Sequence, residues 1–406
     1  MLIVQKYGGT SVGSPERIKA VAERVARCKK EGNDVAVIVS AMSGVTDGLI
    51  ALANKISSNP SDHEMDILLS SGEIVSASLT AMALEALGVK SMAFTGSQAG
   101  IITDNCHTKA KITKIDTQRL ADAIKEGYVP VIAGFQGVTG DLLDITTLGR
   151  GGSDLSAVAV AEGLKADLCE IYTDVDGVYT TDPNVVKDAR KLDKISYEEM
   201  LELASLGAKV LQSRSVEFAK NYNVPLVVRS SFTDDPGTLI VKEDSIMEQV
   251  VVSGIAYDKK QARITIHGVP DKPGIAASLF TAIANENIIV DMIVQNISKE
   301  DKKTDISFTV PKTDINKAIE VTKKITSQLK AESVLLDEDI AKISVVGVGM
   351  RTHSGVAAKI FAVLSENNIN IMMISTSEIK VSCVIDLKYT ELAVRVLHDA
   401  FELNKV

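Results

Sequence analysis

Short apolar runs that alternate with segments of helical spacing restrict the fold of the first 230 residues more than any other feature. The runs are Leu2–Val4, Val35–Val39, Met92–Thr95, Val129–Ala133, Leu168–Thr173 and Val224–Val228. Strands that are apolar throughout and alternate with helices are typical of a mainly parallel sheet covered on both faces. The pattern predicts a three-layer α/β/α domain, in which ligands bind beyond the carboxyl ends of the strands.

An internal repeat follows this domain. Aligning Gly274–Asn296 with Gly355–Ser377, at an offset of 81, gives eight identical pairs in 23 positions. Each copy reads as strand, Gly-containing turn, helix, strand, strand, helix, which is typical of a ferredoxin-like βαββαβ unit. The first copy has a last strand available at Ser333–Leu336, whereas the second copy reaches the end of the chain after its second helix.

The apolar run Val250–Tyr257 lies before the first copy and has no partner there. We expect it to pair antiparallel with the second copy, so that the first unit is inserted within the second. The predicted domains are residues 1–240, residues 262–340, and residues 249–257 together with residues 341–406.

Composition excludes several classes of function. The chain has 406 residues, of which 45% are hydrophobic and 24% charged, as in an ordinary globular protein of several domains. A net charge of -9, no Trp and 4% aromatic residues argue against nucleic-acid partners and anionic membranes. No apolar run is long enough to cross a membrane, and no secretory signal is visible, so we expect no membrane association. Four cysteines without a CxxC pair suit a reducing, cytoplasmic location.

Two glycine-rich segments are candidates for anion binding. They are Lys6-Tyr7-Gly8-Gly9-Thr10-Ser11, after the first apolar run, and Gly149-Arg150-Gly151-Gly152-Ser153-Asp154, before a helical pattern. Glycines let backbone N–H groups approach an anion, and a lysine and an arginine neutralise its charge. A plain turn with a solvated lysine, and a helix cap formed by Ser-Asp beside a surface arginine, are the alternatives.

Two further segments carry acidic groups. Ser71-Gly72-Glu73 leads into a helix rich in Ala and Ser, where a buried carboxylate needs a cationic partner such as a substrate ammonium. A first-turn Glu favoured by the helix dipole explains it equally well. The turn Thr173–Pro183 is either a nucleotide-lining loop or a solvated one, since it lacks EF-hand spacing.

The chain carries no motif for nucleophilic or metal catalysis. Its five histidines pair with no Ser or Cys in the sequence, and no HExxH or other metal-ligand spacing is present, so we predict no metal-ligating residues. Glycine loops with a lysine and an arginine therefore favour phosphoryl transfer, which depends on positioned cations more than on a protein nucleophile.

The ordered set KYGGTSVG, SGE, FQG, GRGGSD, TDVDGVYTTDP and GAKVLQSRSVE resembles the aspartate kinases of the amino-acid kinase superfamily. The repeat, with DKPG and ISTSEI, is similar to the paired ACT domains of those enzymes, so that the resemblance covers essentially the whole chain. It implies an amino-acid kinase domain followed by two ACT units. It also implies ATP-dependent phosphorylation of the β-carboxylate of L-aspartate to 4-phospho-L-aspartate, the first step toward lysine, threonine and methionine. Mg²⁺ is expected to bridge the phosphate oxygens, with few protein ligands.

The resemblance also implies roles for individual residues. Lys6 matches the lysine on the transferred phosphoryl group, and Asp154 the residue that organises it. Aspartate-binding positions are Thr46, Glu73, Arg150, Gly151, Gly152 and Ser153, with Glu73 on the α-ammonium and Arg150 on a carboxylate. Nucleotide positions are Lys6, Tyr7, Gly8, Gly9, Thr173, Asp174, Tyr179, Asn184 and Lys209. Two departures from the family pattern are Leu155-Ser156, at the helix start, and Leu211-Gln212-Ser213-Arg214, which is predicted to alter nucleotide contacts near Lys209.

Effector binding is implied for the ACT units. The matching positions are Asp271, Lys272, Pro273, Gly274, Ile275, Ala276, Asp291, Gln295 and Asn296 in the first unit, and Val356, Ala357, Asn370, Ile371, Ser377 and Glu378 in the second. The plain alternative for DKPG is a turn before a helix. Lysine, threonine or both are the expected effectors, and pairing of exposed ACT strand edges is expected to form a homo-oligomer, either dimer or tetramer.

Two alternatives stay open at this point. One keeps the fold and changes the substrate to glutamate or N-acetylglutamate. The other is an amino-acid sensor whose kinase domain has lost activity. Intact Lys6, Arg150 and Asp154 argue against the second.

Overall fold

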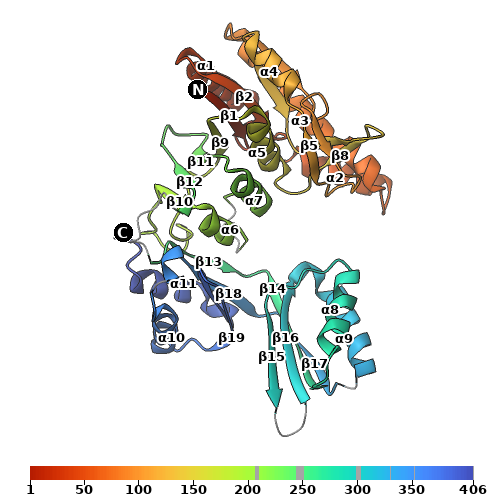
Figure 1. Ribbon diagram of the computed structural model, residues 1–406, viewed down its shortest axis with the longest axis vertical. Coiled ribbons are helices and arrows are strands. Elements are labelled where there is room, and N and C mark those ends of the chain that lie inside the picture. The colour runs from red at the N-terminus through yellow and green to blue at the C-terminus, as the bar shows by residue number, and fades with distance from the viewer. Residues whose placement is uncertain (206–209, 244–250, 299–302, 330, 352, 406) are drawn as a thin grey trace. The chain divides into compact units, whose positions relative to one another are not determined.

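The chain folds into two compact units (Figure 1). The computed structural model describes residues 1–205, 210–243, 251–298, 303–329, 331–351 and 353–405. The first unit consists of Met1–Tyr179 and Lys191–Met247, and the second of Thr180–Arg190 and Glu248–Val406.

An eight-stranded sheet forms the centre of the first unit. Its strands are, in spatial order, β10 (Lys194–Ser196), β12 (Thr238–Val241), β11 (Leu226–Ser230), β9 (Leu168–Thr173), β1 (Leu2–Tyr7), β2 (Asp34–Val39), β6 (Val129–Ala133) and β3 (Ser91–Phe94). All neighbours pair parallel except β11 and β12. The six apolar runs found in the sequence correspond to β1, β2, β3, β6, β9 and β11, so the predicted parallel sheet is confirmed.

Helices cover both faces of this sheet, which confirms the three-layer architecture. The helices of the first unit are α1 (Pro15–Lys30), α2 (Val45–Ile56), α3 (Asp62–Ala86), α4 (Gln118–Lys125), α5 (Gly152–Leu164), α6 (Tyr197–Ser205) and α7 (Ser213–Tyr222). Helices α1 and α3 share a core with β1, β2 and β6 on one face. Helix α5 packs against β1, β9 and β2, and every residue from Gly152 to Ala161 is buried. An α-helix that is buried all round lies within a core rather than on the surface.

Helix α3 deserves separate description because its length and composition would allow it to cross a membrane. Half of its most apolar window is buried inside the first unit, where α3 contacts α1, α2, β3 and β6. It also holds two buried carboxylates, Asp66 and Glu73. These contacts identify α3 as a core helix of this unit.

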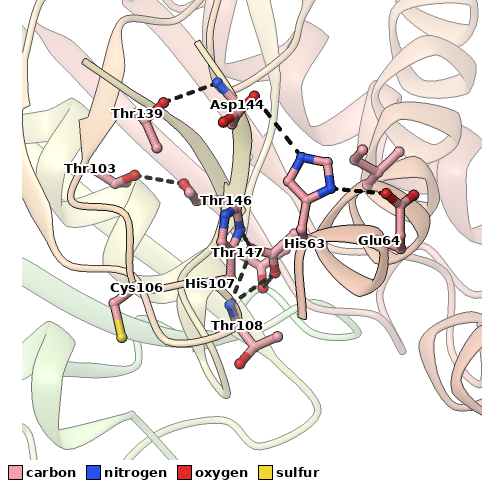
Figure 2. A network of polar contacts seen from close by, with 12 residues as sticks. His63, Glu64, Thr103, Cys106, His107, Thr108, Thr139, Asp144, Thr146 and Thr147 are labelled. Carbon is pink, nitrogen blue, oxygen red and sulfur yellow. Dashed lines mark hydrogen bonds and ion pairs between the residues drawn. The ribbon is translucent and has the colours of Figure 1, made fainter. Parts of the chain in front are cut away.

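A small second sheet adjoins α3 and was not predicted from the sequence. Its strands are β5 (Ile112–Ile115), β4 (Ile101–Thr103), β7 (Gln136–Thr139) and β8 (Ile145–Thr147). A polar network joins it to α3 (Figure 2). Fully buried Asp66 accepts hydrogen bonds from the Thr147 hydroxyl at 2.5 Å and the Thr108 N–H at 3.1 Å, and its Oδ2 lies 2.8 Å from His107 Nδ1.

The second unit contains two four-stranded antiparallel sheets. The first sheet has the order β15 (Ile293–Ser298), β16 (Lys303–Pro311), β14 (Gln261–Pro270) and β17 (Ser333–Asp337). The second has the order β13 (Gly254–Asp258), β18 (Ile340–Val346), β20 (Lys380–Asp386) and β19 (Ile371–Thr376). Helices α8 (Ile275–Asn285) and α9 (Ile315–Leu329) lie side by side on the first sheet (Figure 1), and α10 (Val356–Glu366) and α11 (Thr390–Ala400) pack on the second.

The predicted pairing of the segment before the first copy with the second copy is present. Strand β13 pairs antiparallel with β18, with Gly254 opposite Val346 and Ala256 opposite Ser344. The strand thus begins at Gly254, and Val250 lies outside the described residues. The first sheet completes itself with β17, which pairs with β14, so each sheet has four strands.

The segment Thr180–Arg190 belongs to the second unit although the sequence predicts it within the domain of residues 1–240. Its Thr180 carbonyl accepts the Ile255 N–H at 2.7 Å, and Val186 is buried in the same core as β18 and α11. Tyr257 donates its hydroxyl to Asp182 at 2.9 Å. The apolar residues of this segment find a core only on the second sheet, which is a tertiary contact that local pattern does not reveal.

Replacing Asp66 by Ala is expected to lower the free energy of unfolding by about 3 kcal/mol, because it leaves the buried Thr108 N–H and Thr147 hydroxyl without an acceptor. Chemical denaturation measures this change. Glu85→Ala, at an exposed position near the end of the same helix, is the control and should change the value by less than about 0.5 kcal/mol. An equal response of the two variants would contradict the role given to Asp66.

Candidate active site

The sequence-predicted residues gather where the carboxyl ends of β1, β2 and β9 lie next to one another. Strand β1 pairs with β2 on one side and with β9 on the other, and both pairs are parallel. The chain runs from β1 through α1 to β2 on one side of β1, whereas β9, on the other side, is reached much later through α5. The order of the strands therefore reverses at β1. In open α/β sheets, ligands bind in the crevice at such a switch point.

Lys6 and Asp154 form an ion pair at this edge. The Lys6 Nζ lies 2.6 Å from Asp154 Oδ1, and the two side chains are only 11% and 10% exposed. Lys6 comes from the end of β1, and Asp154 from the first turn of α5. Both predicted catalytic residues therefore meet, and they place a fixed ammonium at the carboxyl end of the central strand.

Glycines after β1 let two strand ends approach closely. A Cβ on Gly9 would lie 2.8 Å from the carbonyl oxygen of Ala41, which follows β2. The Gly8 N–H donates to the Tyr172 carbonyl near the end of β9, at 3.2 Å. A Cβ on Gly8 would lie 3.6 Å from Lys6 Nζ. The Gly-Gly pair thus lets the ends of β2 and β9 lie close to the backbone that follows Lys6, and Gly9 has no room for a side chain.

Glu73 is a buried carboxylate within α3 and is not a first-turn residue. The helix begins at Asp62, so the helix-dipole explanation of Glu73 is wrong. The helix passes through Gly72 because α3 lies close to the end of β2 at this point. A Cβ on Gly72 would lie 2.9 Å from the Ala41 Cβ, so only glycine fits. Glu73 Oε1 accepts the Ala41 N–H at 3.0 Å. Its Oε2 is buried without a hydrogen-bond partner among the residues that the structure describes.

Burial sets the acidity of Glu73. Desolvation raises the pKa of this carboxyl from its ordinary value of 4.5 to about 7, although the hydrogen bond from Ala41 lowers it. A carboxylate that is 4% exposed and has one unpaired oxygen is costly unless a cation or a donor reaches it. The site is therefore suited to a small positively charged group.

The second glycine-rich segment forms the entry to α5. The helix begins at Gly152, and its N-cap is Gly151, at φ 68°, with no side-chain cap hydrogen bond. The predicted Ser-Asp cap is therefore wrong, because Ser153 and Asp154 already belong to the first turn. Both are nearly buried, whereas Arg150 is exposed in the turn before them. The loop thus carries an exposed arginine directly before the helix that holds Asp154.

The remaining predicted substrate and nucleotide positions are distributed differently. Thr46 is half-buried in the first turn of α2. The preceding residue, Val45, packs against Gly72 of α3. Thr173 ends β9, and its hydroxyl donates to exposed Asp174 at 3.1 Å. The Tyr179 hydroxyl donates to Asp176 at 2.9 Å.

Two nucleotide positions lie outside the described part of the first unit. Asn184 lies in the segment Thr180–Arg190, which the structure assigns to the second unit, where its amide groups contact Asp182. Its role at the nucleotide therefore stays a prediction. Lys209 lies outside the described residues.

Most effector positions predicted in the second unit lie on exposed turns and edge strands. Residues Asp271–Gly274 form the exposed turn between β14 and α8, with Gly274 at φ 94° as N-cap, and Ile275 and Ala276 open the helix. Gln295 and Asn296 are exposed on edge strand β15. Asp291 instead forms an ion pair with Lys342 of the second sheet, so its carboxylate links the two sheets.

The second repeat places the equivalent positions in the same way. Val356 and Ala357 open α10, Asn370 and Ile371 lie at the start of edge strand β19, and Ser377 and Glu378 lie in the turn before β20. Glu378 is 3.3 Å from Arg351. The two repeats thus present matching turns and edges.

Sequence reasoning missed several contributors. The Ala41 N–H, which holds Glu73, is a backbone group that no side-chain motif announces. Phe135, within the FQG motif, adopts φ 69° and donates its N–H to the Ser156 hydroxyl at 3.0 Å. A non-glycine residue at positive φ is uncommon and marks a constrained position. In the LQSR segment, Arg214 contacts the carbonyls of Leu148 and Ala110.

Within the described part of the chain, no group of three or more His, Cys, Asp or Glu side chains is arranged to hold a metal ion. A magnesium ion at this site would take most of its ligands from phosphate and water, which is its usual behaviour with nucleotides.

Comparison with known proteins adds independent evidence. The model of the amino acid kinase family matches residues 1–230, and the ACT domain model matches residues 264–324 and 343–401. An aspartate kinase of Stutzerimonas stutzeri is 56% identical over 404 residues, which cover 99% of this chain and 98% of that protein. An aspartokinase of Helicobacter pylori is 55% identical over 410 residues, which cover 100% of both.

Solved structures agree with these relatives. The crystal structure of E. coli aspartokinase III in complex with aspartate and ADP is 25% identical, with a TM-score of 0.82, and the match covers 98% of this chain and 99% of that one. The structure of the same enzyme with lysine and aspartate is 26% identical, with a TM-score of 0.77 and the same coverage.

Glu73→Gln is expected to stabilise the protein at pH 8. The raised pKa means that folding takes up a proton between pH 4.5 and about 7, so the ionised carboxylate costs at most about 3 kcal/mol above pH 7. The amide removes this cost and keeps an acceptor for the Ala41 N–H. Thermal unfolding at pH 8 should therefore show a higher melting temperature for the variant, and at pH 5 the difference should nearly vanish. A variant that is less stable than the wild type at pH 8 would refute the assignment of a desolvated carboxylate to Glu73.

Proposed function

This chain belongs to the amino acid kinase family as an aspartate kinase with two ACT domains, and we propose that it transfers the γ-phosphoryl group of ATP to the β-carboxylate of L-aspartate. The product is 4-phospho-L-aspartate, the first intermediate toward lysine, threonine and methionine. The observation that carries the proposal is the Lys6–Asp154 ion pair at the switch point of the sheet.

Lys6 supplies positive charge where the phosphoryl group is transferred. In phosphoryl transfer, negative charge spreads over the equatorial oxygens, and catalysis depends on positioned cations rather than on a covalent intermediate. Asp154 keeps the ammonium at the carboxyl end of β1 before substrates arrive, so the lysine needs no reorganisation. The backbone from Tyr7 to Gly9 lines the path of the phosphates in this proposal.

Aspartate is bound between Glu73 and the loop of Arg150. The unpaired Oε2 of Glu73 is suited to the α-ammonium, whose charge lowers the pKa of the carboxyl and offsets its desolvation. Arg150 binds a substrate carboxylate by its two parallel N–H groups. Thr46, Gly151, Gly152 and Ser153 complete the substrate site, with the nearly buried Ser153 beside Asp154.

ATP is the phosphoryl donor. Thr173, Asp174 and Tyr179, after the end of β9, form the nucleotide side of the site in this proposal, together with Lys209. Mg²⁺ would neutralise phosphate charge when bound, and the exposed carboxylate of Asp174, after the end of β9, would hold one of its water ligands in this proposal.

The second unit regulates the first. We propose residues 1–240 as the catalytic domain, residues 262–340 as the first ACT unit, and residues 249–257 with 341–406 as the second. Lysine, threonine or both bind the matching turns and edge strands of the ACT units, and edge pairing makes a homo-oligomer. The docked segment Thr180–Arg190 is continuous with the nucleotide loop that ends at Tyr179, so a change in the ACT core is transmitted along the chain. Four free cysteines fit a cytoplasmic location.

Lys6→Ala is expected to lower kcat on the order of 10²-fold or more, with a smaller change in KM for aspartate, because Lys6 acts on charge that develops in the transition state. Coupled measurement of ADP formation, with aspartate, glutamate and N-acetylglutamate side by side, tests the reaction and the substrate. Lys19→Ala, on the exposed face of α1, is the control. A wild-type preference for glutamate, or no aspartate-dependent ADP formation, would end the proposal.

Calorimetric titration with lysine and threonine, singly and together, is expected to show saturable binding of at least one of them to the full-length protein. Gln295→Ala, on edge strand β15, should weaken that binding, whereas Lys317→Ala on α9 should not. Differential affinity for active and inactive states is the basis of such regulation. Heat signals that are absent for both amino acids, alone and in mixture, would contradict effector binding.

A further inference from the structure

The start of α7 holds the loop from which Arg150 projects. Arg214, the second residue of α7, donates from Nη1 to the Leu148 carbonyl at 2.6 Å and from Nη2 to the Ala110 carbonyl at 3.0 Å. Leu148 directly precedes Gly149 and Arg150. Ala110 lies just before β5, and its N–H donates to the Thr147 carbonyl at the end of β8. One guanidinium thus joins two backbone segments, the end of β8 that leads into the Arg150 loop and the segment before β5.

The geometry requires an arginine. Its planar fork carries several N–H donors in fixed directions, so it bridges two carbonyl oxygens at once, whereas a lysine ammonium is a single point on a flexible stem. Both acceptors are neutral backbone groups, and the positive charge strengthens each hydrogen bond. Leu148 is fully buried, and its own N–H donates to the Phe135 carbonyl at 2.8 Å. Both backbone polar groups of Leu148 are therefore held, the N–H by Phe135 and the carbonyl by Arg214.

Gln212, the N-cap of α7, packs closely against the same loop. A Cβ built on Gly151 would lie only 1.6 Å from the Gln212 Cγ, so the glutamine stem occupies the space beside this glycine. One turn after Arg214, Phe218 packs against the buried cluster of Ala110, Leu148 and Leu155. The beginning of α7 therefore fits against the loop by a polar bridge, an apolar contact and a close approach.

This restraint matters because the loop itself is intrinsically flexible. Gly149 and Gly151, which flank Arg150, both adopt left-handed conformations, at φ 77° and φ 68°. Glycines lose more conformational freedom on ordering than other residues, so a loop of this composition needs outside contacts to hold one geometry. A side chain that binds a carboxylate through two parallel N–H groups is effective only when its backbone is already in place.

We propose that Arg214 is a positioning residue, which fixes the loop of Arg150 and thereby the site for the substrate carboxylate. The inference rests on the proposed function. It gives the LQSR segment a role at the aspartate side of the site, whereas the sequence predicts an effect of this segment on nucleotide contacts near Lys209. Arg214 itself does not bind substrate, because its two outer nitrogens already donate to carbonyl oxygens. Its removal therefore affects aspartate binding far more than ATP binding.

The test compares Arg214→Ala, Arg214→Lys and the control Glu217→Ala, which alters an exposed residue of the same helix. Initial rates are measured with aspartate and Mg-ATP varied separately, and melting temperatures are recorded. Arg214→Ala is expected to raise KM for aspartate by about tenfold or more while KM for ATP stays within about twofold. Arg214→Lys should give a value in between, because one of the two hydrogen bonds survives. The control should match the wild type.

A second arm asks whether Arg214 acts through Arg150. In an Arg150→Lys background, Arg214→Ala is expected to raise KM for aspartate by less than about twofold, because the group that it positions has been replaced. Equal increases in both KM values, a loss of kcat or of melting temperature alone, or a full effect in the Arg150→Lys background would overturn the inference. A wild type without aspartate-dependent ADP formation would instead sink the proposed function itself.

Discussion

The architecture of the first unit depends on one nearly buried ion pair, between Lys6 and Asp154. Two charges that lose most of their hydration are costly unless each has a well-placed partner, so the pair constrains what surrounds it. It fixes the first turn of α5 at the carboxyl end of β1. The glycine loop before α5 must then lie at the same edge of the sheet, and Arg150 with it. A cation held in this way is already oriented before any phosphate arrives.

Ala41 is the second point on which the site depends, and it acts through its backbone. Its N–H holds Glu73, its carbonyl oxygen abuts Gly9, and its Cβ abuts Gly72. The end of β2, the loop after β1 and the middle of α3 therefore meet at one small residue. This close packing buries Glu73, with one oxygen that has no partner among the described residues, and the burial raises the pKa of its carboxyl. An ionised carboxyl at this place costs stability, as is common at functional sites.

How far the sequence predicts this structure depends on whether the signal is local. Apolar runs located the six strands of the parallel sheet, and the repeat predicted that β13 would complete the second ACT sheet, because a buried strand must have a partner. The small sheet beside α3 was missed, since its strands are three or four residues long. The start of α3 and the docking of Thr180–Arg190 were also missed. The start of α3 has a local signal, because Ser61 caps the helix by accepting the Glu64 N–H. The docking of Thr180–Arg190 depends on a tertiary contact, a valine that enters a core distant in the sequence.

The most direct test of the account is a crystal structure of the protein with aspartate and a non-hydrolysable ATP analogue. The account predicts that both ligands bind at the carboxyl ends of β1, β2 and β9, with the Lys6 ammonium within hydrogen-bond distance of the terminal phosphate. The aspartate ammonium should then lie on Glu73, and one of its carboxylates on Arg150. A nucleotide bound away from Lys6, with Lys6 still paired only to Asp154, would contradict it.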